Sequence, residues 1–156
     1  MKLRPAFLLI LSGCSLTALL CCTRQEGVQP KSAANSVVIQ CYRGIHQQDT
    51  AALELHLSGT QVSGNLSINY AGRGRDAGNL KGQLKGDTLY ADYGYQSNGI
   101  NIWYRDPVAL LRRGNQLLMG DGMMVTSWGR KYFNKAYPID YARPLFILEP
   151  CACHSK

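Results

Sequence analysis

Cysteine is the residue type whose spacing in this sequence most directly suggests chemistry. The 156-residue chain carries six cysteines, with three in the first 22 residues, Cys41 alone, and Cys151 and Cys153 near the end. Thiols form disulfides, bind soft metal ions such as Cu(I) and Zn(II), and accept lipid groups. Which of these applies depends on the compartment in which the chain folds.

The first 21 residues predict export. Lys2 and Arg4 form a positively charged start, and residues 6–11 (Ala-Phe-Leu-Leu-Ile-Leu) are purely apolar. This pattern is typical of a secretory signal, which is removed from the mature protein. The alternative is a retained helix over residues 6–22, but about 17 residues is the lower limit for crossing a membrane. Removing the signal leaves 15 basic against 10 acidic residues, so the net charge falls from +7 to +5.

A lipid anchor is expected at the end of this signal. Residues 11–14 (Leu-Ser-Gly-Cys) match a bacterial lipobox, in which small residues precede the cysteine that receives a diacylglycerol. We therefore expect cleavage before Cys14 and lipidation there, with Cys22 as the alternative. Residues 22–36 are small and polar and predict a flexible tether, after which residues 37–153 form one domain. The expected location is the bacterial cell envelope, on a membrane, with the outer membrane favoured.

An exported domain meets an oxidising compartment, so a disulfide is expected. A bridge from Cys41 to Cys151, or alternatively to Cys153, would join the two ends of the domain. It would close a loop of roughly 110 residues, for which chain entropy predicts about 4–5 kcal/mol. A metal site of Cys151, Cys153 and His154 is a weaker alternative, because its spacing is unusual and it lies in the last six residues. No metal and no other cofactor is expected.

The elements that position these residues are predicted to be short strands. Charged residues make up only 17% of the chain and hydrophobic residues 46%, which excludes a disordered polyelectrolyte, while 16 glycines and nine tyrosines favour strands and tight turns. Apolar and polar residues alternate with the period of strands that bury one face. The predicted strands span residues 52–57, 62–70, 79–85, 89–95, 100–105, 108–111, 116–125 and 145–148.

This spacing predicts an all-β fold, an antiparallel meander that closes as a small barrel or a sandwich. Gly64 and Gly82 fall on inward positions, where glycine permits the sharp coiling of a small barrel. Pro107 marks a bulge, a break or an edge. Residues 129–143 are the least strand-like and are interpreted as a loop with a short helix.

Several motifs support this fold by resemblance. They are Cys41-Tyr42, Ser58-Gly59-x-x-Val62-x-Gly64, Gly78-x-Leu80-x-Gly82-x-Leu84-x-Gly86-Asp87-Thr88-Leu89-x-Ala91-Asp92-Tyr93, Arg105 with Val108-Ala109-Leu110, and a terminal cysteine. Over Cys41–Leu118 and the end, the chain resembles a group of small bacterial envelope lipoproteins with a lipocalin-like (calycin-type) barrel. The resemblance implies a fold and carries no catalytic signature. The chain differs in having two terminal cysteines instead of one and a basic, Tyr-rich segment over residues 131–143.

No catalytic set is found in the sequence. It contains no Gly-x-Ser-x-Gly, no His-Glu-x-x-His and no phosphate-binding glycine loop. Asp87 and Asp92 lie near one turn, but Asp87 is interpreted as a turn residue. His56 falls on an outward strand position and is interpreted as solvated. We therefore expect a protein that is not an enzyme.

Two kinds of binding function fit these features. The first is binding of a small apolar or amphipathic ligand inside the barrel, since inward apolar faces and small glycines leave space there. The alternative is contact with another envelope protein or an anionic glycolipid through a basic, Tyr-rich surface. Nucleic acid is not an expected partner. Six cations fall at predicted turns, and they are Arg73, Arg75, Arg112, Arg113, Arg130 and Lys131. They would form an anion-binding rim if those turns lie at the same end of the barrel, and otherwise they would simply be solvated.

Overall fold

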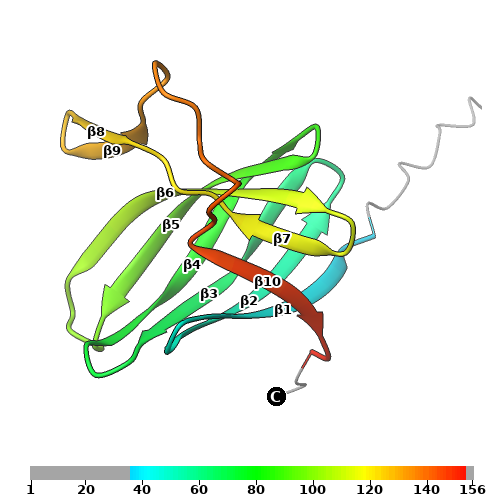
Figure 1. Ribbon diagram of the computed structural model, residues 1–156, viewed down its shortest axis with the longest axis horizontal. Coiled ribbons are helices and arrows are strands. Elements are labelled where there is room, and N and C mark those ends of the chain that lie inside the picture. Colours follow the sequence, from blue (N-terminus) through cyan, green and yellow to red (C-terminus); the bar gives the residue numbers. More distant parts are fainter. Residues whose placement is uncertain (1–35, 154–156) are drawn as a thin grey trace, which may run out of the picture. The chain divides into compact units, whose positions relative to one another are not determined.

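Eight antiparallel strands close into a barrel, and two further strands form a separate hairpin, in the computed structural model, which describes residues 36–153 (Figure 1). The strands are β1 (Val38–His46), β2 (Asp49–Ser58), β3 (Gln61–Tyr70), β4 (Gly74–Lys85), β5 (Thr88–Ser97), β6 (Trp103–Arg113), β7 (Gln116–Met119), β8 (Met124–Ser127), β9 (Arg130–Phe133) and β10 (Phe146–Cys151). Residues 36–153 contain no helix, and so none that could cross a membrane. The predicted all-β class is confirmed, in its barrel form.

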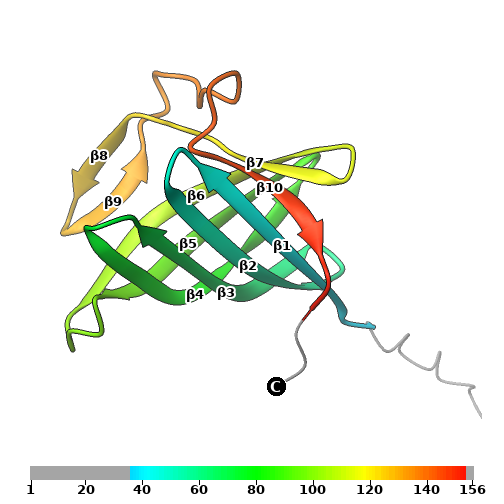
Figure 2. The same ribbon diagram turned by 60° about the horizontal axis from the view of Figure 1, so that its bottom comes forward.

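The strand order is a meander with one exception. Strands β1 to β7 are neighbours in sequence order, and β10 returns to pair with both β7 and β1 (Figure 2). The register places Cys41 opposite Cys151 on the β1 side and Leu148 opposite Leu117 on the β7 side. The barrel therefore closes through β10, the last strand within residues 36–153.

Leucine side chains fill the middle of the barrel. The largest fully buried side chains come from five different strands, and they are Leu55, Leu66, Leu80, Leu110 and Leu148. Each belongs to the inward set of an alternating strand, as the period of two requires. The interior at this level is a packed core, as expected for a barrel of eight strands.

Two inward glycines let neighbouring strands approach closely. A Cβ on Gly64 would collide with the carbonyl oxygen of Glu54, and one on Gly82 would collide with the carbonyl oxygen of Tyr90. Both glycines lie on the inward side, as predicted. Any larger residue would force β2 from β3, or β5 from β4, at these points.

Three local expectations need correction. Strand β1 was not predicted. Its consecutive apolar residues Val38 and Ile39 are both about half exposed, so this part of the strand lacks the expected alternation of apolar and polar residues. The strand predicted over residues 116–125 is interrupted, with residues 120–123 separating β7 from β8. The loop and short helix predicted over residues 129–143 instead contain β9, which pairs with β8.

Pro107 lies within an unbroken β6. Its neighbour on the other side, β7, pairs only with Leu110–Arg113. The missing N–H of Pro107 therefore falls on a stretch of β6 that has a neighbouring barrel strand on one side only, which fits the predicted edge position.

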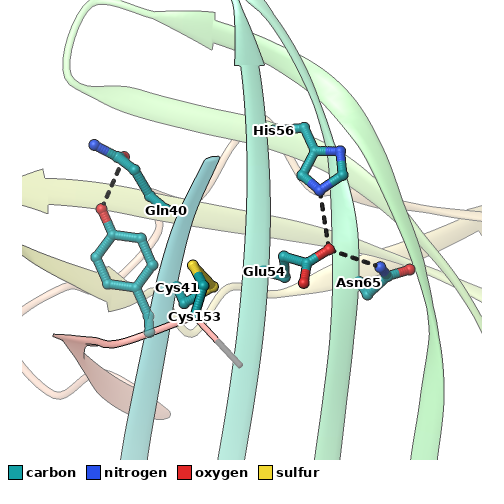
Figure 3. The surroundings of a disulfide bond; sticks show 7 residues. Gln40, Cys41, Glu54, His56, Asn65 and Cys153 are labelled. Carbon is teal, nitrogen blue, oxygen red and sulfur yellow. Dashed lines mark hydrogen bonds and ion pairs between the residues drawn. A yellow bond between two sulfur atoms is a disulfide. The ribbon is translucent and has the colours of Figure 1, made fainter. Parts of the chain in front are cut away.

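The disulfide joins Cys41 to Cys153, the second of the two expected pairings, and leaves Cys151 as an exposed free thiol (Figure 3). Cys151 lies directly opposite Cys41 in the ladder. Opposed side chains have Cβ atoms about 4.5–5.5 Å apart, which is wider than the roughly 3.8 Å of a disulfide. Cys153 lies beyond the end of β10, so its backbone can move closer, and its Cα is 5.2 Å from that of Cys41. The sulfur of Cys153 is consequently not available as a metal thiolate, and His154 lies outside the described residues.

Replacing Cys41 with serine should lower the midpoint of thermal unfolding by about 10 °C, because the bridge closes a long loop beside the barrel seam. Cys151→Ser is the matched control and should leave the midpoint unchanged. Both variants are compared with the oxidised wild-type protein by circular dichroism. A control that falls as far as Cys41→Ser would contradict the Cys41–Cys153 pairing.

Candidate functional site

The six predicted rim cations do not gather at one place. Turns in a meander alternate between the two ends of the barrel, so Arg112 and Arg113, next to the β6–β7 turn, lie at the opposite end from Arg73 and Arg75, around the β3–β4 turn. Arg73 is also paired, since its Nη2 lies 2.6 Å from Asp49 Oδ2. The single anion-binding rim is therefore not formed.

The other two cations of that set belong to the β8–β9 hairpin, which lies against β6 (Figures 1 and 2). Arg130 and Lys131 are consecutive residues of β9, and each reaches a carboxylate of the barrel wall. Arg130 Nη2 lies 3.1 Å from Asp92 Oδ2, and Lys131 Nζ lies 2.7 Å from Asp106 Oδ1. These two ion pairs fasten the hairpin to the wall.

A chamber of about 130 Å³ lies under this hairpin, at the end of the barrel where β7 finishes and β10 begins. Its lining combines apolar side chains from the barrel with polar side chains on the walls and hairpin residues above. The apolar ones include Ile68, Val108 and Met119, the polar ones are Tyr70, Asp76, Tyr93, Tyr95, Asp106 and Asp121, and the hairpin supplies Met124 and Phe133. We call this space the mouth chamber.

Stacked tyrosines form one wall of the mouth chamber. The rings of Tyr93 and Tyr95 are 4.8 Å apart, and Tyr104 continues the stack at 5.5 Å from Tyr95. The hydroxyl of Tyr93 donates to the carbonyl oxygen of Leu66, and that of Tyr95 donates to Asp106 Oδ2 at 3.1 Å. The polar ends of these side chains are thereby held in fixed positions around the cavity.

Three aspartates line the chamber and give it a negative character, and they are Asp76, Asp106 and Asp121. Asp106 is contacted by Tyr95 and by Lys131, whereas Asp76 has no Lys, Arg or His group within ion-pair distance in the described part of the chain. Burial, followed by the charge of Asp76, raises the pKa of Tyr70 to about 12. Burial also raises the pKa of Tyr93 and of Tyr95 well above the usual value, with Asp76 and Asp106 as the next causes. The chamber therefore disfavours a further negative charge.

A larger hollow of about 620 Å³ lies elsewhere, on the outer wall formed by β10, β1, β2 and β3. Small residues such as Gly44 and Ala52 line it, together with Ile45 and Ile147. The space predicted inside the barrel is thus smaller than the groove outside it. A typical pocket for a small organic ligand has a volume of about 300–1,000 Å³. At about 130 Å³, the mouth chamber accepts only a small group.

The remaining candidate residues lie on the outer surface. His56 Nε2 is 2.9 Å from Glu54 Oε1, and Asn65 donates to the same oxygen, beside the disulfide (Figure 3). These side chains are half exposed, and such surface contacts contribute about 0–1 kcal/mol. Asp87 lies in the β4–β5 turn as interpreted, while Asp92 lies within β5 and contacts Arg130. Within residues 36–153, no group of three or more His, Cys, Asp or Glu side chains is arranged to hold a metal.

The comparisons with known proteins give no relative. No known family profile matches the chain, and neither the curated proteins nor the solved structures contain a significant match. The eight-stranded closed barrel is consistent with a lipocalin-like fold. The resemblance to envelope lipoproteins stays a prediction, and the signal, Cys14, Cys22 and nearly all of the tether lie outside the described residues.

The sequence contained a signal for the chamber carboxylates that was not used. Asp76 is in phase with inward Gly78 and Leu80, and Asp106 is in phase with inward Val108 and Leu110. An acidic residue at an inward position of a strand is exceptional, because burial of an unpaired charge is costly. Such residues are candidates for a functional role.

The raised pKa of Tyr70 predicts a loss of stability in alkali. Between pH 10 and about pH 12, the unfolded chain loses the Tyr70 proton while the folded barrel retains it, so the free energy of unfolding falls as pH rises. Urea unfolding at pH 9 and pH 11 measures this fall, and Tyr70→Phe should make it smaller. Tyr137→Phe, which removes an exposed phenol, is the control. Equal falls in wild type and Tyr70→Phe would contradict the assignment.

Proposed function

We propose that this protein is a lipid-anchored barrel of the bacterial envelope that binds a small amphipathic ligand at the mouth chamber and catalyses no reaction. The observation that carries the proposal is a cavity with an apolar floor and three carboxylates, placed between a packed leucine core and a hairpin cover. Apolar lining with a few fixed polar groups is the usual composition of a small-molecule site.

The charges of the chamber indicate which end of the ligand enters. Asp106 accepts a hydrogen bond from Tyr95 and lies beside the Lys131 ammonium group. Lys131 therefore occupies the place that a donor or cationic group of a ligand would take. The stacked tyrosine rings beside it also favour a cation over an anion. A ligand with a protonated amine fits this arrangement, with its apolar body in contact with Met119 or Val108.

Entry of a ligand larger than about 130 Å³ requires the hairpin to move, because that is the volume of the chamber beneath it. The contacts that hold the hairpin include two partly exposed ion pairs, with Lys131 48% and Arg130 49% exposed. Pairs of this kind contribute about 0–1 kcal/mol each. The hairpin is joined to the barrel through residues 120–123 and 134–145, which contain Gly120 and Gly122. The β8–β9 hairpin therefore acts as a lid.

Export and the lipid anchor are supported by the sequence and by the disulfide. The charged and apolar start followed by Leu-Ser-Gly-Cys14 is typical of a lipoprotein signal, and a Cys41–Cys153 bridge suits an oxidising compartment. A contact role with another envelope protein is the second candidate. It is favoured by Trp128, which is fully exposed at the tip of the hairpin.

The test is native and intact mass spectrometry of the full-length protein extracted from envelope membranes. We expect a lipidated chain that begins at Cys14 or Cys22, gains two hydrogens on reduction and carries one small molecule. Asp106→Asn should lower the occupancy by about tenfold, because a hydrogen bond to a charged group is lost. Asp87→Asn, at a distant turn, is the matched control and should retain the ligand.

Three results would count against the proposal. A chain that begins at Met1 would contradict export. A wild-type protein without any bound small molecule, or equal occupancy in Asp106→Asn and wild type, would contradict the mouth chamber as the site. A protein found in place of a small molecule would favour the second candidate.

A further inference from the structure

A second cleft, separate from the mouth chamber, lies on the outer face of the barrel wall. On β4 the outward positions carry Lys81, Gln83 and Lys85, and the register places Gln83 opposite Tyr90 of β5. These four side chains are exposed on the same side of the sheet. They form the floor and one wall of the cleft.

The other wall comes from the lid and the segment that follows it. Tyr132 and Lys135 line the same hollow of about 380 Å³, together with Phe133. Arg130 fixes this part of the chain over the sheet through its ion pair with Asp92. Two segments that are distant in sequence thus place three lysines around one hollow, and we call it the lysine cleft.

The lysine cleft has an unbalanced positive charge. Lys81, Lys85 and Lys135 form no ion pair with any carboxylate of residues 36–153. Asp92 is the one carboxylate among its described lining residues, and it is engaged by Arg130 at 3.1 Å and approached by Arg105 at 3.9 Å. Three ammonium groups without partners around a concave surface attract anions.

Aromatic rings give the cleft a second recognition element. Tyr90 is 41% exposed and Tyr132 is 45% exposed, and both line the hollow. A tyrosine side chain offers an apolar ring face and a hydroxyl that donates and accepts. A sugar has the matching combination of an apolar C–H face and hydroxyl groups, whereas an inorganic anion has only charge.

From these features we infer that the lysine cleft binds an anionic saccharide, that is, a sugar carrying a phosphate or carboxylate group. The lysines hold the anionic group, and Tyr90 and Tyr132 contact the ring. The headgroup of a glycolipid and a soluble acidic polysaccharide share this chemistry. The lysines and exposed tyrosines of this site do not line the mouth chamber, which disfavours negative charge, although the two hollows share Phe133 of the lid.

The first test compares binding of glucose 6-phosphate, inorganic phosphate and glucose to the full-length protein in detergent micelles by isothermal titration calorimetry. The triple variant Lys81→Gln/Lys85→Gln/Lys135→Gln should weaken the Kd for glucose 6-phosphate by about tenfold or more. The control Arg43→Gln/Arg112→Gln/Arg113→Gln removes equal charge outside the cleft and should change it less than about twofold. Equal weakening in both variants, or no saturable binding to wild type, would overturn the site.

A second variant tests the sugar part of the inference. Tyr132→Leu keeps an apolar side chain but removes the ring, so the Kd for glucose 6-phosphate should rise towards that for inorganic phosphate. The Kd for inorganic phosphate itself should not change. If wild type binds both ligands equally, or if Tyr132→Leu preserves the preference for the sugar phosphate, recognition of a saccharide is contradicted.

The source of the saccharide is distinguished with two further probes. The first probe is flotation with phosphatidylcholine vesicles that contain a phosphorylated glycolipid, compared with plain phosphatidylcholine vesicles. A lipid headgroup is supported if the glycolipid increases flotation of the wild type and does not increase flotation of the lysine triple variant. Binding of a soluble oligogalacturonate that the same variant abolishes supports a polysaccharide. Failure of both probes would overturn the inference, and Asp106→Asn should affect neither, which keeps this site distinguishable from the mouth chamber.

Discussion

The return of β10 between β7 and β1 is the constraint on which the rest of the structure depends. Without it, two strands would present unpaired edges, which are prone to pair with other chains. One strand satisfies both edges, with Leu148 opposite Gly44 on β1 and opposite Leu117 on β7. The Cys41–Cys153 disulfide lies beside the same seam. Although β7 and β10 are antiparallel neighbours, residues 120–145 leave the barrel between them, and that excursion contains the β8–β9 hairpin.

Two neighbouring residues of the lid strand β9 show how the barrel wall separates two environments. Arg130 and Lys131 are adjacent, yet Arg130 pairs with outward Asp92 and Lys131 with inward Asp106. The lid is therefore attached to both faces of the wall. Inside, carboxylates and tyrosines favour a cationic or donor group. Outside, unpaired lysines favour an anion. We therefore propose that one small barrel has two sites of opposite electrostatic preference.

Much of the barrel could be predicted from its sequence, because β2, β3 and β5 alternate between buried and more exposed residues over much of their length. Strand β1 escaped prediction because its exposed Val38 and Ile39 are apolar, and the break between β7 and β8 was not predicted although Gly120-Asp121-Gly122 is a turn signal. The disulfide partner depended on ladder register, which spacing alone does not define. Asp76 and Asp106 were missed because they were assigned to turns and breaks and not to inward strand positions. The lysine cleft joins residues that are far apart in sequence, so no local pattern could reveal it.

Amide hydrogen exchange of the oxidised protein, read by mass spectrometry, is the most direct test of a closed barrel with a movable lid. We predict that β10 exchanges as slowly as β1 and β7, since Phe146–Leu148 pair with β7 and Leu148–Cys151 pair with β1, and that β8 and β9 exchange much faster. Exchange in β10 as fast as in the hairpin would show that the barrel is open at its seam. Hairpin exchange as slow as that of the barrel would contradict the lid.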